Sequence, residues 1–356
     1  MNSLRSKYLA VLCAAAVSTG LLGACTPADE GGSGTAGSGG VDVVSLVDAE
    51  GKRPIEDIED ELGDPSGDSE IRLCYITRTL SNEYWSFERD GFEQAAQEYG
   101  VEYETYAVND EASITEQLDK AQSAMRSGCS AILASPISAT ALDSVFDNAI
   151  SQGIPVIILN DAASSVAGTV YVGPDATTIG QTAARYIAQR LPDGGKVAMI
   201  EGDPGSSNAQ NRGTGFREAL AANYPNIELV ASTTAKWDTA LAKDTAAGML
   251  TANEDLAAIY CQNDTMALGA MSAIQEKGRQ GEVVLVGTDG IPQAKTEIAN
   301  DNGYTATVSE RPTTEGSSGV KVALWMLAGN RVPAFVDVPA FVVDGTNVND
   351  YLTGMP

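Results

Sequence analysis

The chain has 356 residues, with 48 acidic against 22 basic side chains, and its net charge at pH 7 is −26. This charge argues against nucleic acid or an anionic bilayer surface as a binding partner, because both are negative. The chain contains no histidine, which excludes Ser-His-Asp triads, Cys-His pairs and His-ligated metal sites. We therefore expect neither an enzyme nor a protein that depends on a metal or another cofactor.

Residues 1–25 have the pattern of a targeting segment. A short positive region precedes an apolar run at residues 9–17, which is too short to span a bilayer as a helix. Residues 22–25, Leu-Gly-Ala-Cys, resemble the lipobox of bacterial lipoproteins. The resemblance implies cleavage before Cys25, lipid on its thiol, and an extracytoplasmic location at the outer face of the bacterial cell membrane. The alternative is an ordinary secretory signal that happens to contain a cysteine.

Residues 26–70 differ in composition from the rest of the chain. Residues 26–40 are mostly Gly, Ser, Thr, Ala and acid, and residues 48–70 are strongly acidic. So few apolar side chains cannot offset the entropy lost on ordering. We predict a flexible tether that holds a folded body away from the membrane, although Ile55 and Ile58 could form one helical turn.

From residue 71 onward, short apolar runs alternate with amphipathic stretches. In the first half we predict strands at residues 71–76, 101–108, 131–134 and 155–159. The helices between them are closed by Gly100, Gly128 and Gly153, and the second begins with a capping box, Ser-Ile-Thr-Glu, at residues 113–116.

The same rhythm returns in the second half. We predict strands at residues 196–200, 227–231, 257–260 and 283–286, and helices at residues 208–223, 238–251, 264–277 and 292–300. Near-continuous apolar strands that alternate with helices indicate a parallel sheet covered on both faces. The fold class is therefore α/β, with two doubly wound parallel-sheet domains and a boundary near residues 173–174.

The cysteines after Cys25 are isolated. Cys74, Cys129 and Cys261 have no CxxC spacing, and each can be read as a small buried apolar residue. A Cys74–Cys129 disulfide is possible in an oxidising compartment, and the sequence leaves this open.

Polar and aromatic residues follow most of the predicted strands. In open parallel sheets ligands collect beyond the carboxyl ends of the strands. The candidate ligand-binding residues are Arg78, Asn82, Tyr84, Trp85, Ser135, Asn160, Asp161, Arg212, Trp237, Asn263 and Asp289. Amides, charged groups and flat rings suit a polyhydroxylated ligand, whose hydroxyls donate and accept hydrogen bonds while its C–H faces cover rings. The competing interpretations are helix N-caps for the Asn and Asp residues and core packing for the two aromatic residues of the first half.

Five segments resemble, in order, the type I sugar-binding proteins related to ribose-binding protein. They are Thr-Leu-Ser-Asn-Glu-Tyr-Trp at 79–85, Gly-Ile-Pro-Val-Ile at 153–157, Arg-Gly-Thr-Gly-Phe at 212–216, Gln-Asn-Asp-Thr-Met-Ala-Leu-Gly-Ala at 262–270, and Val-Gly-Thr-Asp-Gly at 286–290. The resemblance implies the type I periplasmic binding protein fold, with a three-segment hinge. It places residues 71–173 plus 311–338 in an N-terminal domain and residues 174–310 plus 339–356 in a C-terminal domain.

The resemblance also implies roles for individual residues. Asn82, Tyr84 and Trp85 match the first-domain ligand contacts, and the rings of Tyr84 and Trp85 would lie across the sugar from Trp237. The second-domain hydrogen-bonding set corresponds to Arg212, Asn263 and Asp289.

Four positions depart from the ribose-binding pattern. Asn160 and Asp161 stand where ribose binders carry Asp-Arg, and Glu310 stands where they carry Gln. Arg78 replaces a small polar residue and can pair with one of the new carboxylates. Ribose itself is therefore not the expected ligand, and another pentose, a hexose, a polyol or an amine-bearing sugar fits these acceptors.

The resulting hypothesis is the substrate-binding component of an ABC-type sugar import system. The protein would capture a small sugar or polyol by closing two domains, hand it to a membrane ABC permease, and act as a monomer that touches the membrane only through its N-terminal lipid. One alternative is a sensory protein that presents its ligand-bound form to a membrane receptor. Another is a glycosidase that uses Asp289 with Glu310 or Asp161.

Overall fold

The computed structural model describes residues 42–161 and 165–353, and these residues form two α/β lobes, each built on one sheet. In the first lobe seven strands lie in the order β1 (Val47–Pro54), β12 (Val332–Asp337), β6 (Thr169–Gly173), β5 (Val156–Leu159), β4 (Ala131–Ala134), β2 (Arg72–Thr79), β3 (Glu102–Val108). All neighbouring pairs in this sheet are parallel. Its helices are α1 (Ile55–Leu62), α2 (Glu83–Glu98), α3 (Ile114–Arg126), α4 (Asp143–Ser151) and α10 (Pro312–Leu327).

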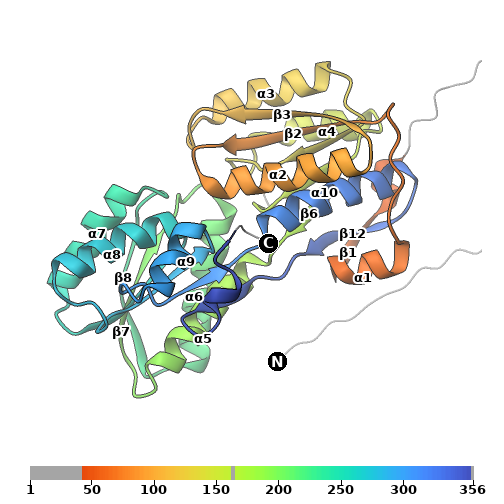
Figure 1. Cartoon of the computed structure of the whole chain (residues 1–356). Helices are drawn as coiled ribbons and strands as arrows, with labels where there is room; N and C mark the ends of the chain where they lie inside the picture. The colour runs from red at the N-terminus through yellow and green to blue at the C-terminus, as the bar shows by residue number, and fades with distance from the viewer. Residues whose placement is uncertain (1–41, 162–164, 354–356) are drawn as a thin grey trace, which may run out of the picture. The chain divides into compact units, whose positions relative to one another are not determined.

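The second lobe is built on six strands. Their order is β13 (Phe341–Asp344), β11 (Ala306–Ser309), β10 (Val284–Asp289), β9 (Leu256–Cys261), β7 (Gly195–Glu201), β8 (Ile227–Thr234). The β11–β13 pair is antiparallel and the others are parallel. Its helices are α5 (Ala176–Arg190), α6 (Ser207–Asn223), α7 (Thr239–Ala252), α8 (Asp264–Glu276) and α9 (Pro292–Ala299). The predicted α/β class with doubly wound parallel sheets is confirmed (Figure 1).

Both faces of each sheet are covered. In the first lobe Leu73 and Tyr75 of β2 pack in the core that includes α2 and α10, whereas Cys74 and Ile76 pack in the core that includes α3 and α4. Consecutive strand residues therefore enter opposite cores, which explains why the strands are apolar without alternation. The second lobe has the same pair of cores around its own sheet.

The chain passes between the two sheets three times. The passages lie between β6 and α5, between β11 and α10, and between β12 and β13. At the first and third passages the backbone N–H of Val338 donates to the carbonyl of Gly173 at 3.1 Å, so these two segments run side by side. None of the helices in the described part of the chain is both long and apolar enough to cross a membrane.

Cys74 and Cys129 form a disulfide, with Cα atoms 5.8 Å apart. The bridge joins β2 to the turn before β4. Cys261 is a free, buried thiol. Since disulfides persist mainly in oxidising compartments, the bridge agrees with an extracytoplasmic protein.

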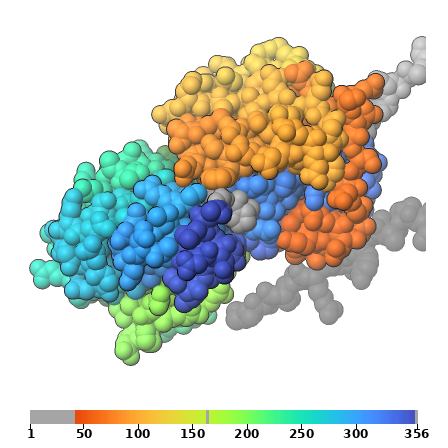
Figure 2. All heavy atoms as spheres, viewed as in Figure 1, coloured from red at the N-terminus to blue at the C-terminus, as the bar shows by residue number. Residues whose placement is uncertain are grey.

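The tether predicted for residues 26–70 is wrong over residues 43–62. These residues form a short 3₁₀ turn (Val43–Leu46), β1 and α1, and β1 pairs with β12 as the edge strand of the first sheet. Ile55 and Ile58 are 2% and 1% exposed and pack in the core that contains Trp325 of α10. In Figure 2 the red-orange atoms of this segment lie against the blue atoms of the C-terminal part of the chain. The acidic composition concealed an amphipathic helix whose apolar residues are few but fully buried.

Replacing Ile58 by Val should measure this docking. The change removes one methylene from a buried site, so we expect the free energy of unfolding to fall by about 1 kcal/mol. Ile114→Val is the matched control, because Ile114 is 43% exposed on α3 and the same change there should have almost no effect. Urea unfolding of both variants gives the comparison, and equal midpoints would show that α1 contributes nothing to the fold.

Candidate functional site

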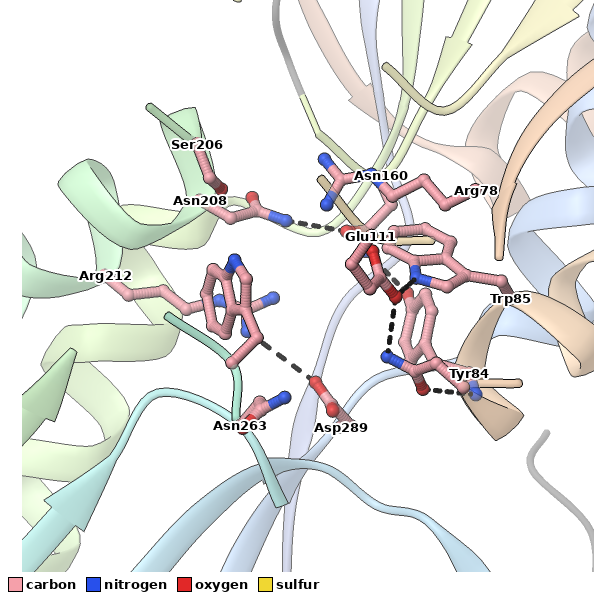
Figure 3. Close-up of a pocket in the computed structure, with 12 residues that line it drawn as sticks. Arg78, Tyr84, Trp85, Glu111, Asn160, Ser206, Asn208, Arg212, Asn263 and Asp289 are labelled. Atoms are coloured by element: carbon pink, nitrogen blue, oxygen red, sulfur yellow. Dashed lines mark hydrogen bonds and ion pairs between the residues drawn. The ribbon is translucent and has the colours of Figure 1, made fainter. Parts of the chain in front are cut away.

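Residues at the carboxyl ends of strands in both sheets line one polar cavity. The lining residues are Arg78, Asn82, Tyr84, Trp85, Glu111, Asn160, Ser206, Asn208, Arg212, Trp237, Asn263 and Asp289 (Figure 3). The cavity has a volume of about 30 Å³. Nine of the predicted site residues lie here together, and the remaining three, Ser135, Asp161 and Glu310, lie behind the lining.

The first-lobe wall begins at the N-terminus of α2. The side chain of Asn82 caps this helix by accepting a hydrogen bond from the backbone N–H of Tyr84 at 3.1 Å. The rings of Tyr84 and Trp85 meet edge to face, with centroids 4.9 Å apart. Both are buried in a core and also line the cavity. Capping or core packing and a place in the site are therefore compatible for these residues.

Glu111 completes this wall, and sequence reasoning missed it. It lies in the loop after β3, where its Oε1 accepts hydrogen bonds from Nε1 of Trp85 at 2.9 Å and from Nδ2 of Asn82 at 3.2 Å. Arg78 lies over the Trp85 ring, 4.7 Å from its centroid, a favourable cation–π contact. The available signal was positional, because Glu111 follows a strand end as the predicted residues do.

The second-lobe wall is centred on Arg212 of α6, which is 3% exposed. Its Nη1 donates to the carbonyl of Gln262 at 2.7 Å and lies 3.6 Å from Oδ1 of Asp289, while Nη2 is ion-paired with Glu310. Burial opposes the charge on Arg212, but Glu310 and Asp289 outweigh it and raise the pKa of the guanidinium. Arg212 therefore stays charged in the closed site.

Asp289 ends β10, and a second buried carboxylate fixes its loop. Asp264 accepts hydrogen bonds from the backbone N–H groups of Gly290 at 2.7 Å and Ile291 at 2.9 Å. Burial raises the pKa of Asp289 well above its usual range, and Glu310 and Asp264 add to this effect against Arg212. A ligand hydroxyl that donates to Asp289 would replace the hydrogen bonds from water that this side chain loses on burial.

Backbone strain is concentrated at the cavity. Five non-glycine residues in the described ranges have positive φ, and three of them line the site: Asn160 at 58°, Trp237 at 67° and Asp289 at 114°. Such conformations cost about 1–3 kcal/mol each and persist where the surrounding structure enforces them, which is common at ligand sites.

Asn160 and Asp161 join the two lobes. Oδ1 of Asn160 accepts from Nδ2 of Asn208 at 2.6 Å. The carboxylate of Asp161 accepts from Oγ of Ser206 at 2.9 Å and from the backbone N–H of Asn208 at 3.1 Å, at the N-terminus of α6. Arg78 donates to the same carboxylate at 2.5 Å, which confirms the predicted pairing of Arg78 with a carboxylate. Asp161 does not line the cavity because these contacts occupy its oxygens.

Ser206 and Asn208 are the other residues that sequence reasoning missed. The side chain of Ser206 caps α6. The signal that could have found it was the Ser that follows the Gly-Asp-Pro-Gly loop at residues 202–205. Ser206 caps a helix of the second lobe and also donates to Asp161 of the first lobe. The contact between the lobes cannot be predicted from the local sequence around Ser206.

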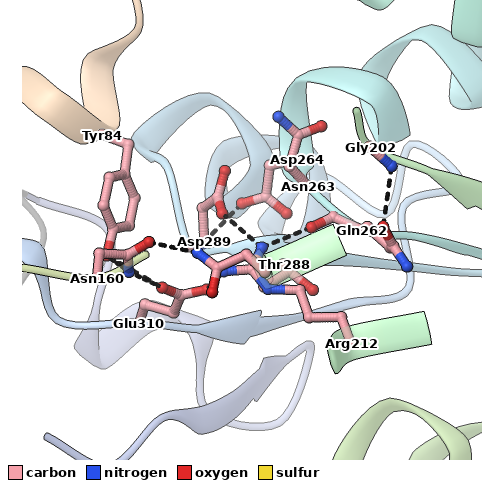
Figure 4. Close-up of polar contacts among 12 residues, drawn as sticks. Tyr84, Asn160, Gly202, Arg212, Gln262, Asn263, Asp264, Thr288, Asp289 and Glu310 are labelled. Carbon is pink, nitrogen blue, oxygen red and sulfur yellow. Dashed lines mark hydrogen bonds and ion pairs between the residues drawn. The ribbon is translucent and has the colours of Figure 1, made fainter. Parts of the chain in front are cut away.

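Glu310 forms the floor behind Asn160 and Tyr84. One of its oxygens accepts from Nδ2 of Asn160 at 2.6 Å and from the Tyr84 hydroxyl at 3.0 Å, while the other is paired with Arg212 (Figure 4). Glu315 lies 2.9 Å from the same hydroxyl, and both acids are fully buried. Burial and the neighbouring Glu310 raise the pKa of Glu315 well above its usual range. Glu310 is therefore a support of the lining, with its oxygens already occupied.

Ser135 lies behind the first-lobe wall. Its Oγ donates to Oε2 of Glu88 at 2.7 Å, and the Tyr75 hydroxyl donates to the same oxygen. Burial raises the pKa of Glu88 to about 7. The predicted ligand contact of Ser135 is thus replaced by a buried hydrogen-bond network. No group of three or more acidic or cysteine side chains within the described residues could hold a metal ion.

Comparisons with known proteins agree with this geometry. The family model for the periplasmic binding protein domain matches residues 73–331 of this chain. The D-allose-binding periplasmic protein of Escherichia coli is 32% identical over 274 residues, which cover 75% of this chain and 88% of that protein. A solved solute-binding protein of an ABC transporter from Actinobacillus succinogenes, with bound D-allose, is 28% identical with a TM-score of 0.74, covering 79% of this chain and all of that one.

A further solved structure comes from a signalling protein. The fructose-binding periplasmic domain of a hybrid two-component system is 26% identical with a TM-score of 0.73, and the match covers 79% of this chain and 93% of that domain. The two sheets, the cavity between them and these matches together show that the chain belongs to the type I periplasmic binding protein family.

Proposed function

We propose that this protein is the substrate-binding component of an ABC-type sugar importer and that it captures a small polyhydroxylated ligand without altering it. The observation that carries the proposal is a polar cavity between the two lobes, lined by hydrogen-bond donors and acceptors from both. The buried Nε–H groups of Arg78 and Arg212 have no acceptor in the described part of the chain, and the carboxylate of Asp289, 3.6 Å from Nη1 of Arg212, lines the cavity. A hydroxyl group both donates and accepts, so a polyol can satisfy both kinds of group.

Capture depends on closure of the lobes. Asp161 and Asn160 of the first lobe hold the N-terminus of α6 of the second lobe, and ligand contacts from both walls would add to this closed state. The cavity is small in this arrangement of the lobes, so the ligand would enter a more open form. Its contacts with both walls would then favour the form in which the lobes meet.

The experiment is a binding screen of the purified protein against pentoses, hexoses, polyols and amino sugars. A ligand that binds only the folded state raises the unfolding temperature as its concentration exceeds Kd. We expect a saturable thermal shift and no product formation from glycosides. Turnover of a glycoside, or no shift with any of these compounds, would contradict the proposal.

Asp289→Ala should weaken binding of the ligand found in this screen by at least about 2 kcal/mol, or about 30-fold, because a buried hydrogen-bond partner is lost. Calorimetry measures the change. Asp255→Ala is the control, since Asp255 is exposed and pairs with Lys196 on the surface. Unchanged affinity in a folded Asp289→Ala protein would remove Asp289 from the site.

Lipid on Cys25 would keep the protein at the outer face of the cell membrane, close to the permease that receives the ligand. Cys25 lies outside the described residues, so this part rests on the lipobox resemblance and on the extracytoplasmic location of the family. We propose that the protein is a monomer. Mass spectrometry of the mature protein tests the anchor through the lipid mass on the N-terminal cysteine.

The second candidate function is sensory, and the match to the periplasmic domain of a two-component system favours it. The closed form would then contact a membrane receptor in place of a permease. Cross-linking of the ligand-bound protein in its native membrane separates the two, because the partner is a permease in one case and a receptor in the other.

A further inference from the structure

The charges around the cavity do not balance. Two cations, Arg78 and Arg212, and two carboxylates, Glu111 and Asp289, line it. Directly behind them Asp161 and Glu310 pair with the two guanidinium groups. Glu315 belongs to the same hydrogen-bonded group through Asn160, so five acidic side chains lie around two cations.

Neither guanidinium is available to compensate a charged ligand. Arg78 is 2.5 Å from Asp161 and also donates to the carbonyl of Pro136. Arg212 is shared among Glu310, Asp289 and the Gln262 carbonyl. The free Nε–H groups can donate to a hydroxyl or to a carboxylate alike, so the hydrogen bonds do not discriminate between these ligands and the charge balance decides.

Glu111 is the carboxylate that is not neutralised by a cation. Its Oε1 takes hydrogen bonds from two neutral donors, Trp85 and Asn82. Its Oε2 has no hydrogen-bond partner among the described residues, and the side chain is half-buried at the cavity wall (Figure 3). Asp289 stands on the other lobe, so closure brings acceptors to both sides of the ligand.

From this arrangement we propose that Glu111 is a specificity-determining residue which, with Asp289, makes the cavity reject sugars that carry an acid group and accept neutral polyols and amine-bearing sugars. The proposal rests on the proposed function and specifies its ligand class. A carboxylate or phosphate on the ligand would bring a further negative charge into a site of low dielectric, where like charges repel strongly. An ammonium group would instead bring donors to Glu111 and Asp289.

The test compares neutral, acidic and amine forms of one skeleton by calorimetry. The probes are D-glucose, D-glucuronate and D-glucosamine, the corresponding D-galactose series, and the pairs D-allose with D-alluronate and xylitol with D-xylonate. We expect the acid to bind at least 100-fold more weakly than its neutral counterpart, and the amine to bind within tenfold of the neutral form or more tightly. An acid that binds within tenfold of its neutral counterpart, or an amine that is rejected as strongly as the acid, would overturn the proposal.

Glu111→Gln tests the residue itself. The amide oxygen of Gln can still accept from Trp85 and Asn82, so the wall keeps its hydrogen bonds while the charge is lost. We expect the ratio of neutral to acid affinity to fall at least tenfold, with the neutral ligand little affected. Glu83→Gln is the matched control, because Glu83 is exposed in the first turn of α2 beside the site and does not line it.

The outcomes separate this inference from the proposed function. If neutral sugars bind and the ratio of neutral to acid affinity is the same in Glu111→Gln and wild type, the charge of Glu111 does not determine specificity. The proposed sugar-binding function is then unaffected. If none of the neutral, acidic or amine probes binds, the proposed function itself fails and the specificity falls with it. A Glu111→Gln protein that does not fold leaves the wild-type ratio of acid to neutral affinity as the deciding measurement.

Discussion

Replacing Arg212 by Met should lower the free energy of unfolding by about 3–5 kcal/mol near neutral pH, because it leaves buried carboxylates without their cation. Arg212 is 3% exposed, and it is the side chain that contacts both Glu310 and Asp289. The Gln262 carbonyl would also lose its donor. Ligand binding should be lost in the same variant, since Arg212 supplies one wall of the cavity.

The control lies five residues further along the same helix. Arg217 pairs with Glu201 at 2.6 Å, but its side chain is 42% exposed, and an exposed pair is worth about 1 kcal/mol at most. Arg217→Met should therefore shift the urea midpoint only slightly. If the two variants lose equal stability, the buried charges around Arg212 are not coupled as the distances indicate.

A second substitution tests whether the loss of stability comes from the charges. Adding Glu310→Gln to Arg212→Met removes one of the stranded carboxylates, so the double variant should recover part of the lost stability. Non-additivity in this cycle measures the Arg212–Glu310 coupling directly. An additive cycle would mean that the lost stability comes from packing, not from charge.

Features that depend on a few neighbouring residues could be predicted from the sequence, whereas features that depend on contacts between distant segments could not. The alternation of apolar strands with helices is a local pattern that predicted the α/β fold, and the polar and aromatic residues that follow most of the strands include nine of the cavity residues. The family resemblance supplied the pairing of the two halves across a cavity. Residues that end strands or cap helices could therefore be placed without any coordinates.

The features that were missed depend on contacts between distant segments. Residues 43–62 look like a tether because the segment is acidic, yet two isoleucines bury themselves against α10, more than 250 residues away. Glu111 is a site residue because it accepts hydrogen bonds from Trp85 and Asn82 at the N-terminus of α2, a different segment of the chain. Asp161 was predicted to contact ligand and instead holds the other lobe, because Ser206 and the N-terminus of α6 reach it first.

Glu88→Gln should stabilise the protein above pH 7 and leave it unchanged near pH 4.5. Glu88 is fully buried on α2, where its Oε2 accepts from Tyr75 and Ser135 and its Oε1 has no hydrogen-bond partner in the described ranges. Burial raises its pKa from 4.5 to about 7, while those hydrogen bonds and the nearby Arg78 only partly oppose the shift. Gln has the shape of the protonated acid and cannot ionise.

The sign of the pH effect follows from proton linkage. Because the pKa of Glu88 is higher in the folded state than in the unfolded state, the folded protein holds the proton more tightly. Its contribution to stability is therefore complete below about pH 4.5 and is lost as pH rises through about 7. A shift from 4.5 to about 7 corresponds to a contribution on the order of 3 kcal/mol, at about 1.4 kcal/mol for each pH unit. Wild type should lose this amount between pH 4.5 and pH 8, and the Gln variant should keep it.

Thermal unfolding of wild type and Glu88→Gln at pH 4.5, 6, 7 and 8 gives the comparison as a difference between two proteins, so the other carboxylates cancel. Glu98→Gln on the same helix is the control, because Glu98 is exposed and its replacement should not change the pH profile. Equal unfolding temperatures of wild type and Glu88→Gln at pH 8 would show that Glu88 ionises without cost. In that case water or a rearrangement of Tyr75 and Ser135 must stabilise the carboxylate. The hydrogen-bond network around Glu88 would then rearrange more easily than its contacts indicate.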